Sequence, residues 1–463
     1  MDLNKLTVAE AKEGLKEKKF SVTELTKACL ERIKRVDSKI KALVTVSEDE
    51  ALARAKEFDR QEGKNPPLRG IPVTVKDVLS TKDLQTTASD KILEGYLPIY
   101  DASVVEKIKE AGAIIVAKTN CDPFAFGAST ENSAFGPTKN PWDLERVPGG
   151  SSGGSAASIA ADEAIFSLGT DTGGSIRQPA SFCNIVGLKP SYGSDSRFGL
   201  MAMASSFDCP GPMSKTVEDC EEIYRLIRGK DFSDATSIAV FHQKENHDKL
   251  KIGLPKEYFS SGVNPEVREA VQKAAQEFEK NGFSIEEISL PHTDYVVAIY
   301  YILVPSEISS NMARYDGIRF GKERKCFSDE VKRRIMIGTY ALSAGYYDAF
   351  YLKASKARSL IMSDFQEAFK KVDFLLAPVS PNPPFKLGEK SKDPLQMYLE
   401  DILTAGINLA GIPSLALPCG FSKEKLPIGM QLIGPLFSEE RLLATGKIYQ
   451  NFTDWHKRKP NLN

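Results

Sequence analysis

Residues 149–181 read GGSSGGSAASIAADEAIFSLGTDTGGSIRQPAS. Two serine-bearing glycine clusters lie in this stretch, joined by an alanine-rich segment that can form a helix and by an apolar run, 164–168, typical of a buried strand. A helix followed by a buried strand indicates an α/β protein. Glycine permits close backbone approach and leaves N–H groups free to bind an oxyanion. The clusters, with Ser151 and Ser152 in the first and Ser175 in the second, therefore indicate a serine-dependent catalytic site.

The same alternation of short apolar runs and helical patterns continues outward from this stretch. Strands buried on both faces read as continuous apolar runs, so we predict an α/β fold around a largely buried sheet. Two polar stretches, 231–249 and 378–394, are interpreted as insertions in one domain because strand-like runs resume after each. The predicted strands are 72–78, 113–117, 164–168, 251–254, 374–379, 415–418 and 430–433, and helical patterns cover 103–112 and 264–282.

The first 65 residues are predicted to be helical. Thr7 with Glu10, and Ser21 with Glu24, each fit the capping-box pattern, in which a hydroxyl at the helix start is answered by a glutamate three residues later. We therefore expect one helix to begin after each hydroxyl residue.

The composition excludes several classes of protein. The chain has 463 residues and a net charge of −1, which disfavours a dedicated nucleic-acid binder. Its 7 cysteines include no CxxC pair, which favours reduced thiols over disulfides or a zinc site. The charged N-terminal residues do not resemble a signal peptide, and no apolar run approaches the roughly 18 residues that span a bilayer. We expect a cytoplasmic protein without a membrane contact.

Two familiar uses of a glycine-rich serine cluster fit this sequence poorly. A phosphate-binding loop would need the GxxxxGK[ST] pattern, which is missing here. The GxSxG elbow of serine hydrolases needs a preceding strand and a histidine base, but Pro141 and Pro148 lie before the cluster. None of the 4 histidines lies in a glycine-rich or strand-end setting; they are His242, His247, His292 and His456. A nucleophilic serine here would need another base.

Lysine can serve as that base when burial lowers its pKa and makes the neutral amine available. Residues 70–77 read GIPVTVKD and place Lys76 inside an otherwise apolar strand. A lysine in mid-strand is uncommon unless it lies at an edge or has a partner. Taken alone, Lys76 fits a structural role equally well.

Three segments together resemble the amidase signature family: GIPVTVKD, GGSSGGSA and LGTDTGGSIRQPA. Lys76 precedes Ser151 by 75 residues, and Ser151 precedes Ser175 by 24, which also fits the family. The resemblance implies a single large α/β domain over residues 1–463, with a central mixed β-sheet covered by helices on both faces. Within it we expect an N-terminal helical segment (1–65), a signature core (about 66–215) and a substrate-pocket half (about 250–463).

The resemblance also implies a Ser–cisSer–Lys triad. Ser175 would be the nucleophile, Ser151 the bridging serine after a cis peptide bond, and Lys76 the base. Ser129 would line the pocket. The other implied roles belong to the backbone: the oxyanion would be bound by the N–H groups of Thr172, Gly173, Gly174 and Ser175. No metal is implied. From the residues themselves, we interpret Ser152 and Ser155 as turn and helix-capping residues and Asp171 as a support for the loop.

The second half narrows the resemblance to the glutamine-hydrolysing subunits of tRNA-dependent amidotransferases. The matching segments include LPHTDYVVAIYYILVPSEISSNMARYDGIRFG and DPLQMYLEDILTAGINLAGIPSLALPCG. By position, Arg334 would hold the glutamine carboxylate, Asp401 the ammonium, and Tyr300 would help close the pocket. Local sequence alone instead favours an exposed helical charge at Arg334, and it cannot decide whether Glu400 or Asp401 faces the pocket.

This resemblance implies partners as well as a substrate. The chain would release ammonia from glutamine for a B-type subunit, in a heterotrimer with a small C-type subunit. That partner would bind ATP and Mg²⁺ and most of the misacylated tRNA, converting Glu-tRNA(Gln) to Gln-tRNA(Gln), with Asp-tRNA(Asn) as a further substrate left open. This chain would need no cofactor of its own. A stand-alone amidase acting on a small amide is the main alternative, ahead of a lipid-amide hydrolase or an inactive binding scaffold.

Overall fold

A mixed β-sheet runs through the computed structural model, which describes residues 2–61, 65–239, 250–318, 321–391 and 393–462. Over these residues the sheet has 11 strands in the order β1-β3-β2-β4-β6-β5-β10-β11-β9-β7-β8. The strands are β1 (Leu43–Val46), β2 (Pro72–Lys76), β3 (Ile114–Thr119), β4 (Phe166–Asp171), β5 (Val186–Lys189), β6 (Cys209–Ser214), β7 (Lys251–Pro255), β8 (Ser284–Ile288), β9 (Phe374–Pro378), β10 (Ser414–Phe421) and β11 (Pro427–Ile433).

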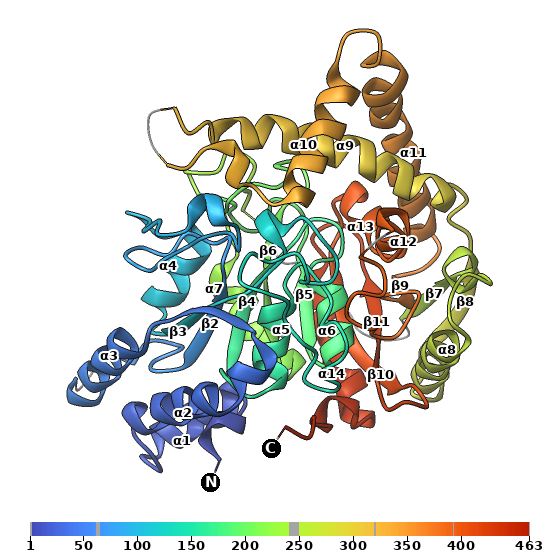
Figure 1. Cartoon of the computed structure of the whole chain (residues 1–463). Coiled ribbons are helices and arrows are strands. Elements are labelled where there is room, and N and C mark those ends of the chain that lie inside the picture. The colour runs from blue at the N-terminus through green and yellow to red at the C-terminus, as the bar shows by residue number, and fades with distance from the viewer. Residues whose placement is uncertain (1, 62–64, 240–249, 319–320, 392, 463) are drawn as a thin grey trace.

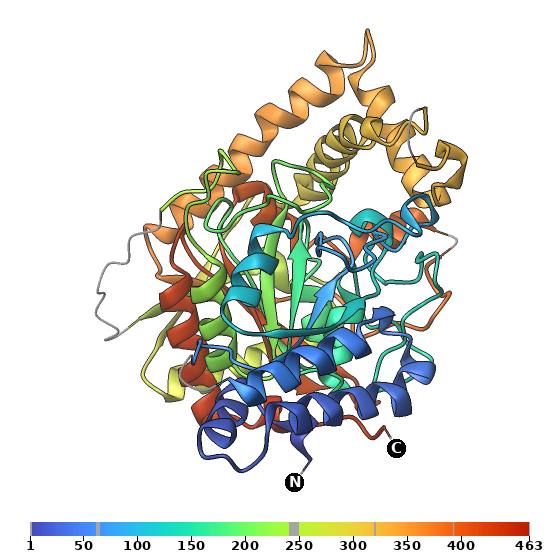
Figure 2. The same cartoon turned by 90° about the vertical axis from the view of Figure 1, so that its left-hand side faces the viewer.

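Helices cover both faces of this sheet (Figures 1 and 2). They are α1 (Val8–Lys16), α2 (Val22–Ile40), α3 (Glu48–Arg60), α4 (Ser103–Glu110), α5 (Gly153–Ala160), α6 (Arg177–Cys183), α7 (Val217–Ile227), α8 (Pro265–Lys280), α9 (Val296–Asn311), α10 (Asp329–Leu342), α11 (Lys353–Phe369), α12 (Pro394–Leu399), α13 (Ala405–Ala410) and α14 (Glu439–Phe452). The α/β fold class, with a mixed sheet between helical layers, is confirmed.

The predicted strands and the two later helical patterns are found with small shifts at their ends, but the strand β1 interrupts residues 1–65, which we predicted to be helical. All seven predicted strands form, and the two helical patterns become α4 and α8. Both capping boxes are present at the starts of α1 and α2. The stretch 378–394 lies between elements of one sheet, as an insertion would, while residues 240–249 of the other polar stretch lie outside the described residues. All seven cysteines are free thiols.

The side chains of β2 point alternately to the two faces of the sheet, where they have different neighbours. Val73 and Val75 pack into a core with α4 and α7. Because side chains alternate along a strand, Thr74 and Lys76 point to the other face, where Thr74 meets Ser158 of α5. The parallel strand β4 lies beside β2. The carboxyl ends of these two strands therefore open toward one edge of the sheet, beside the start of α5.

The helices α9, α10 and α11 form a cap over one end of the sheet (Figure 1). We expected no apolar run near the length of a membrane span, but the helical stretch Thr293–Arg314 is long and apolar enough to cross a bilayer by length and composition. Half of its most apolar window is buried inside the protein. That burial is typical of a core helix, and α9 packs against α10, α11 and α13.

Candidate active site

Lys76 is the centre of a buried hydroxyl cluster. It ends β2 with a fully buried side chain. Its Nζ lies 2.8 Å from the Oγ atoms of Ser151 and Ser152, and 2.9 Å from Oγ1 of Thr170. Burial lowers the pKa of Lys76 to about 8, although nearby acidic groups such as Asp122 oppose the shift. The neutral amine is therefore far more available near physiological pH than in an exposed lysine, whose pKa is about 10.4.

Ser151 reaches Lys76 through an unusual loop before α5. The peptide bond between Gly150 and Ser151 is cis, as the resemblance implies. The loop also passes close to its neighbours, since a Cβ on Gly150 would lie 2.4 Å from the backbone N of Ser129. The residues immediately before the loop form no strand. The serine-hydrolase elbow is therefore excluded for this cluster.

Ser152 differs from its predicted role as a helix cap. It occupies the position before α5 but its side chain makes no capping hydrogen bond. Its Oγ instead donates to the carbonyl of Thr170 at 3.0 Å and accepts a hydrogen bond from Lys76. Ser155 likewise pairs with Thr119, at 2.7 Å, and caps nothing. The capping interpretation of both serines is wrong, because tertiary partners outcompete the helix end.

We expect the Ser152→Ala variant to lose about tenfold in kcat, since one buried hydrogen bond to an ionisable group contributes about 1.5 kcal/mol or more. Ser152 commits its own proton to a carbonyl and so accepts from Lys76, which stabilises the ammonium form. Removing it lowers the Lys76 pKa, and the acid limb of the pH–rate profile should move to lower pH. Ser158→Ala, six residues further along the chain on α5 and bonded to Thr74, is the matched control. An unshifted profile would contradict this role.

The loop after β4 carries Ser175. The N–H of Ser152 donates to the carbonyl of Ser175 at 3.1 Å, so the two glycine clusters lie side by side. Ser175 is 7% exposed, whereas Lys76 and Ser151 are completely buried. Of these three side chains, Ser175 is the one that a molecule arriving from solvent can reach.

Asp171 supports this loop, in agreement with its predicted role. Its carboxylate accepts hydrogen bonds from the backbone N–H groups of Gly174 and Ile176, and it forms a buried ion pair with Arg177. Burial alone would raise the pKa of Asp171, but the Arg177 guanidinium outweighs burial and holds the pKa well below its usual range. Asp171 therefore stays ionised and keeps the loop fixed.

The predicted set of oxyanion donors needs one correction. Gly174 donates its N–H to Asp171 at 2.9 Å, so this donor is already occupied. In the described part of the chain, the N–H groups of Thr172, Gly173 and Ser175 have no such partner. The geometry therefore leaves three candidate donors on the Ser175 loop.

Arg334 is buried in the cap, with only 3% of its side chain exposed. Its Nε donates to Glu330 at 2.7 Å, and its guanidinium lies against the stacked pair of rings of Tyr301 and Tyr398, 5.0 and 4.9 Å from the ring centroids. Cation–π contacts of this kind favour a desolvated guanidinium. The alternative of an exposed helical charge is thus wrong.

Asp401 and Glu400 have separate environments. Tyr301 donates its hydroxyl to Asp401 at 2.7 Å, beside Arg334, and burial raises the pKa of Asp401 to about 7. Glu400 is instead paired with Lys390 and accepts hydrogen bonds from Ser380 and Asn382. Of the two carboxylates, Asp401 is the one on the Arg334 side.

Tyr300 and Ser129 flank the two glycine clusters. A Cβ on Gly173 would lie 2.3 Å from the Tyr300 hydroxyl oxygen, so this ring rests directly on the Ser175 loop. Ser129 is fully buried, and its Oγ has no hydrogen-bond partner among the described residues. Its backbone N donates to Asp122 at 3.3 Å.

Several residues of the site were not predicted from the sequence: Ser152 as a lysine partner, Thr170, Tyr301, Tyr398 and Thr404. Ser152 was visible as the second serine of its cluster, but a hydroxyl before a helix normally signals a cap. The others carry no local pattern, because each acts through a partner distant in sequence. Among the described residues, no group of three or more His, Cys, Asp or Glu side chains could hold a metal ion.

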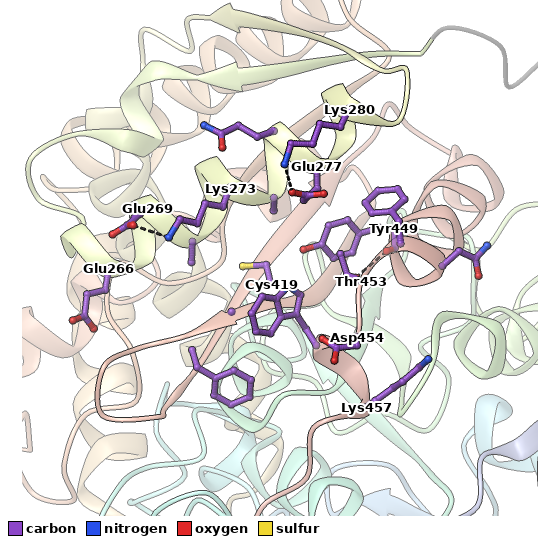
Figure 3. Close-up of a pocket in the computed structure, with 18 of the residues that line it drawn as sticks. Glu266, Glu269, Lys273, Glu277, Lys280, Cys419, Tyr449, Thr453, Asp454 and Lys457 are labelled. Atoms are coloured by element: carbon purple, nitrogen blue, oxygen red, sulfur yellow. Dashed lines mark hydrogen bonds and ion pairs between the residues drawn. The ribbon is translucent and has the colours of Figure 1, made fainter.

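A cavity of about 990 Å³ lies elsewhere, between α8, β10 and the end of α14 (Figure 3). Cys419 and Tyr449 lie on its floor, and Lys273 and Lys280 lie along α8 at its rim. It contains none of the predicted site residues. Cavity size therefore does not identify the candidate active site, which depends on the buried lysine and the two glycine clusters.

Known proteins resemble this chain in both sequence and fold. The A-type subunit of glutamyl-tRNA(Gln) amidotransferase from Sulfurihydrogenibium sp. is 52% identical, and that from Desulfatibacillum aliphaticivorans 50%, each over 100% of both chains. The crystal structure of the same A-type subunit from Thermotoga maritima has a TM-score of 0.83 and 41% identity, covering 100% of this chain and 97% of that one.

More distant structures share the fold. The structure of 6-aminohexanoate cyclic dimer hydrolase superposes with a TM-score of 0.89 over 99% of both chains, at 22% identity. The sequence model of the amidase family matches residues 24–443. This chain therefore belongs to the amidase family.

Proposed function

We propose that this chain is the glutamine-hydrolysing subunit of a tRNA-dependent amidotransferase. The observation that supports the proposal most strongly is the likeness, over the whole chain, to proteins named as the A-type subunit of glutamyl-tRNA(Gln) amidotransferase. The hydroxyl cluster around Lys76 supports the amide chemistry, and the Arg334–Asp401 pair supports an amino acid as substrate.

The proposed reaction begins with a proton transfer. Neutral Lys76 accepts the proton of Ser151 while Ser151 accepts that of Ser175, and the Ser175 oxygen attacks the side-chain amide carbon of glutamine. The N–H groups of Thr172, Gly173 and Ser175 stabilise the oxyanion. The relay then returns the proton to the departing nitrogen, and ammonia leaves. Water, activated by the same relay, hydrolyses the acyl-enzyme to glutamate.

In this proposal, the α-carboxylate and α-ammonium groups of glutamine are bound by residues at the cap. Of the described residues, only Glu330 accepts a hydrogen bond from Arg334, through Nε, so the remaining guanidinium N–H groups are available for a carboxylate. Asp401 binds the ammonium group when it is ionised. Tyr300 closes the pocket against the Ser175 loop, and Ser129 lines it.

The ammonia is delivered to a partner in the proposed complex. A B-type subunit, with ATP and Mg²⁺, amidates the misacylated tRNA and provides most of the tRNA contacts, and a small C-type subunit completes a cytoplasmic heterotrimer. The near-zero net charge of this chain, −1, supports placing the tRNA mainly on the partner. Glutamate carried by tRNA(Gln) is the proposed acceptor, and the use of aspartate carried by tRNA(Asn) depends on the partner subunits and on the tRNAs present.

The Asp401→Asn variant tests the proposed substrate. Losing a charge-assisted hydrogen bond of about 1.5–3 kcal/mol should raise KM for glutamine about 10- to 100-fold, measured as ammonia release. Hydrolysis of a simple aliphatic amide, which has no ammonium group, should be unchanged. Asp348→Asn, at an exposed position outside the pocket, is the matched control.

Assembly provides the second arm of the test. We expect the chain to copurify with B-type and C-type subunits, and ammonia release from glutamine to rise when they and charged tRNA are added. A chain that hydrolyses aliphatic amides well, ignores glutamine and recruits no partner would instead be a stand-alone amidase.

A further inference from the structure

The peptide unit between Gly173 and Gly174 is held at both of its polar ends. The hydroxyl of Thr404 donates to the carbonyl of Gly173 at 2.6 Å. The N–H of Gly174 donates to Asp171 at 2.9 Å. The C=O and N–H of a trans peptide point in opposite directions, so these two hydrogen bonds fix the rotation of the whole plane.

This peptide unit needs such restraint because glycine flanks it on both sides. Gly174 has φ of +142°, a conformation that L side chains rarely adopt. Without Cβ atoms, little steric resistance opposes rotation of the peptide plane. The N–H groups of Gly173 and Ser175, two of the three candidate oxyanion donors, lie on the two adjoining peptide units, which meet the held unit at the Cα atoms of Gly173 and Gly174. A displacement of the held unit moves both Cα atoms, so the positions of both donors depend on what holds the Gly173 carbonyl.

Thr404 is itself held rigidly. Its side chain is 1% exposed, and a Cβ on Gly174 would lie 2.4 Å from its Oγ1, so the two segments are in close contact. The Thr404 carbonyl accepts hydrogen bonds from both Nη atoms of Arg177, each at 3.2 Å. Arg177 also pairs with Asp171 at 3.0 Å. Thr404, Arg177 and Asp171 thus close a buried ring around the Gly173–Gly174 peptide.

We infer that Thr404 is a positioning residue for the oxyanion site: its hydroxyl anchors the Gly173–Gly174 peptide and thereby fixes the places from which the N–H groups of Gly173 and Ser175 extend. The inference rests on the proposed acyl transfer at Ser175. Thr404 also donates its backbone N–H to the carbonyl of Asp401 at 3.1 Å. The turn that carries the proposed ammonium ligand therefore also fixes the proposed oxyanion donors.

The test compares Thr404→Val, which keeps the shape but removes the hydroxyl, with Thr404→Ser, which keeps the hydroxyl. Loss of one oxyanion donor lowers kcat by about 10²–10³-fold. We expect Thr404→Val to lose about 10²-fold in kcat for glutamine with KM changed by less than about threefold, and Thr404→Ser to stay within about threefold of wild type. Thermal melting shows whether each variant is folded, and Thr404→Ala replaces Thr404→Val if the latter is not.

A second readout separates the oxyanion from ground-state binding. The γ-aldehyde analogue of glutamine forms a tetrahedral adduct with a nucleophilic serine, whereas glutamate binds without reacting. In Thr404→Val, inhibition by the aldehyde should weaken by the factor lost from kcat/KM, while inhibition by glutamate stays unchanged. Equal losses in Thr404→Val and Thr404→Ser, a full kcat in Thr404→Val, or equal weakening of both inhibitors would overturn the inference.

Assays of the wild-type enzyme distinguish a failure of the proposed function from a failure of the inference about Thr404. If wild type hydrolyses another amide but not glutamine, the substrate assignment fails, and the same kcat comparison of Thr404 variants is made with that amide and its aldehyde. If the Ser175→Ala variant retains activity, the acyl transfer itself fails, and the inference about Thr404 fails with it.

Discussion

The Ser175→Ala variant should release no measurable ammonia from glutamine, with kcat at least about 10⁴-fold below wild type. Ser175 is the proposed nucleophile, and at 7% exposed it is the least buried of the three proposed catalytic residues, since Lys76 and Ser151 are completely buried. The hydrogen bond that joins Ser175 to Ser152 runs from the Ser152 N–H to the Ser175 carbonyl, so alanine at position 175 keeps it. The melting temperature should therefore stay close to that of wild type.

The informative control is an assay that bypasses ammonia release. In the assembled complex with ATP, Mg²⁺ and misacylated tRNA, Ser175→Ala should still support amidation when ammonium chloride replaces glutamine. Ser181→Ala, whose hydroxyl accepts from the N–H of Gly429 away from Lys76, is a matched control for a serine lost from the same segment. Glutamine hydrolysis that survives Ser175→Ala would exclude the proposed nucleophile.

Activity should fall steeply as the pH is lowered through 8. The proposed base must be the neutral amine, and burial lowers the pKa of Lys76 to about 8. Below that pH the protonated form predominates. For a simple amide, kcat/KM should then drop about tenfold for each pH unit and reach a plateau above the pKa. A profile flat from pH 6 to 9 would contradict Lys76 as the base.

The same profile measured with glutamine should show a second titration. Burial raises the pKa of Asp401 to about 7, and the proposed ammonium contact needs the ionised carboxylate. Below pH 7 both Lys76 and Asp401 are mainly protonated, which is the inactive form of each. The value of kcat/KM for glutamine should therefore fall by about 100-fold for each pH unit. In Asp401→Asn, kcat/KM for glutamine should fall by only about tenfold for each pH unit, and the remaining titration, that of Lys76, should stay near pH 8. Lys76→Met, similar in length but without an amine, should be inactive at every pH.

Apolar runs and capping boxes in the sequence were sufficient to predict most of the strands in the sheet and the starts of the first two helices. The seven predicted strands are apolar runs, and both capping boxes lie where the hydroxyl and glutamate spacing indicates. The strands β1, β5, β6 and β8 were missed. β6, CPGPMS, contains two prolines, which argue against a central strand, yet it pairs with β4 and β5 in the middle of the sheet. Tertiary pairing here overrides local propensity.

The family motifs predicted that Lys76 and Ser151 lie together, as they do, but no local pattern predicted the contacts that cross between motifs. Ser152 was misassigned because its position before α5 favours a cap, whereas the buried Lys76 offers a stronger partner. Arg334 ends a basic run that suggests solvent exposure, but its guanidinium is buried against the stacked rings of Tyr301 and Tyr398. The occupied N–H of Gly174 could not be foreseen, because it depends on where the Asp171 side chain turns.

The protein carries its proposed bond-breaking residues and its proposed recognition residue Arg334 on different layers of the fold. The proposed bond-breaking residues are anchored on β2 and β4 and the loops beside them, inside the sheet layer. The proposed recognition residue Arg334 lies on α10 in the cap, and Asp401 follows α12. A descendant could therefore exchange the cap helices that carry Arg334 and acquire a new substrate, provided that it kept the turn after α12, whose Thr404 holds the Ser175 loop. Such modular inheritance would explain how one fold accommodates proteins as different as a cyclic-dimer hydrolase and part of a tRNA-dependent amidotransferase.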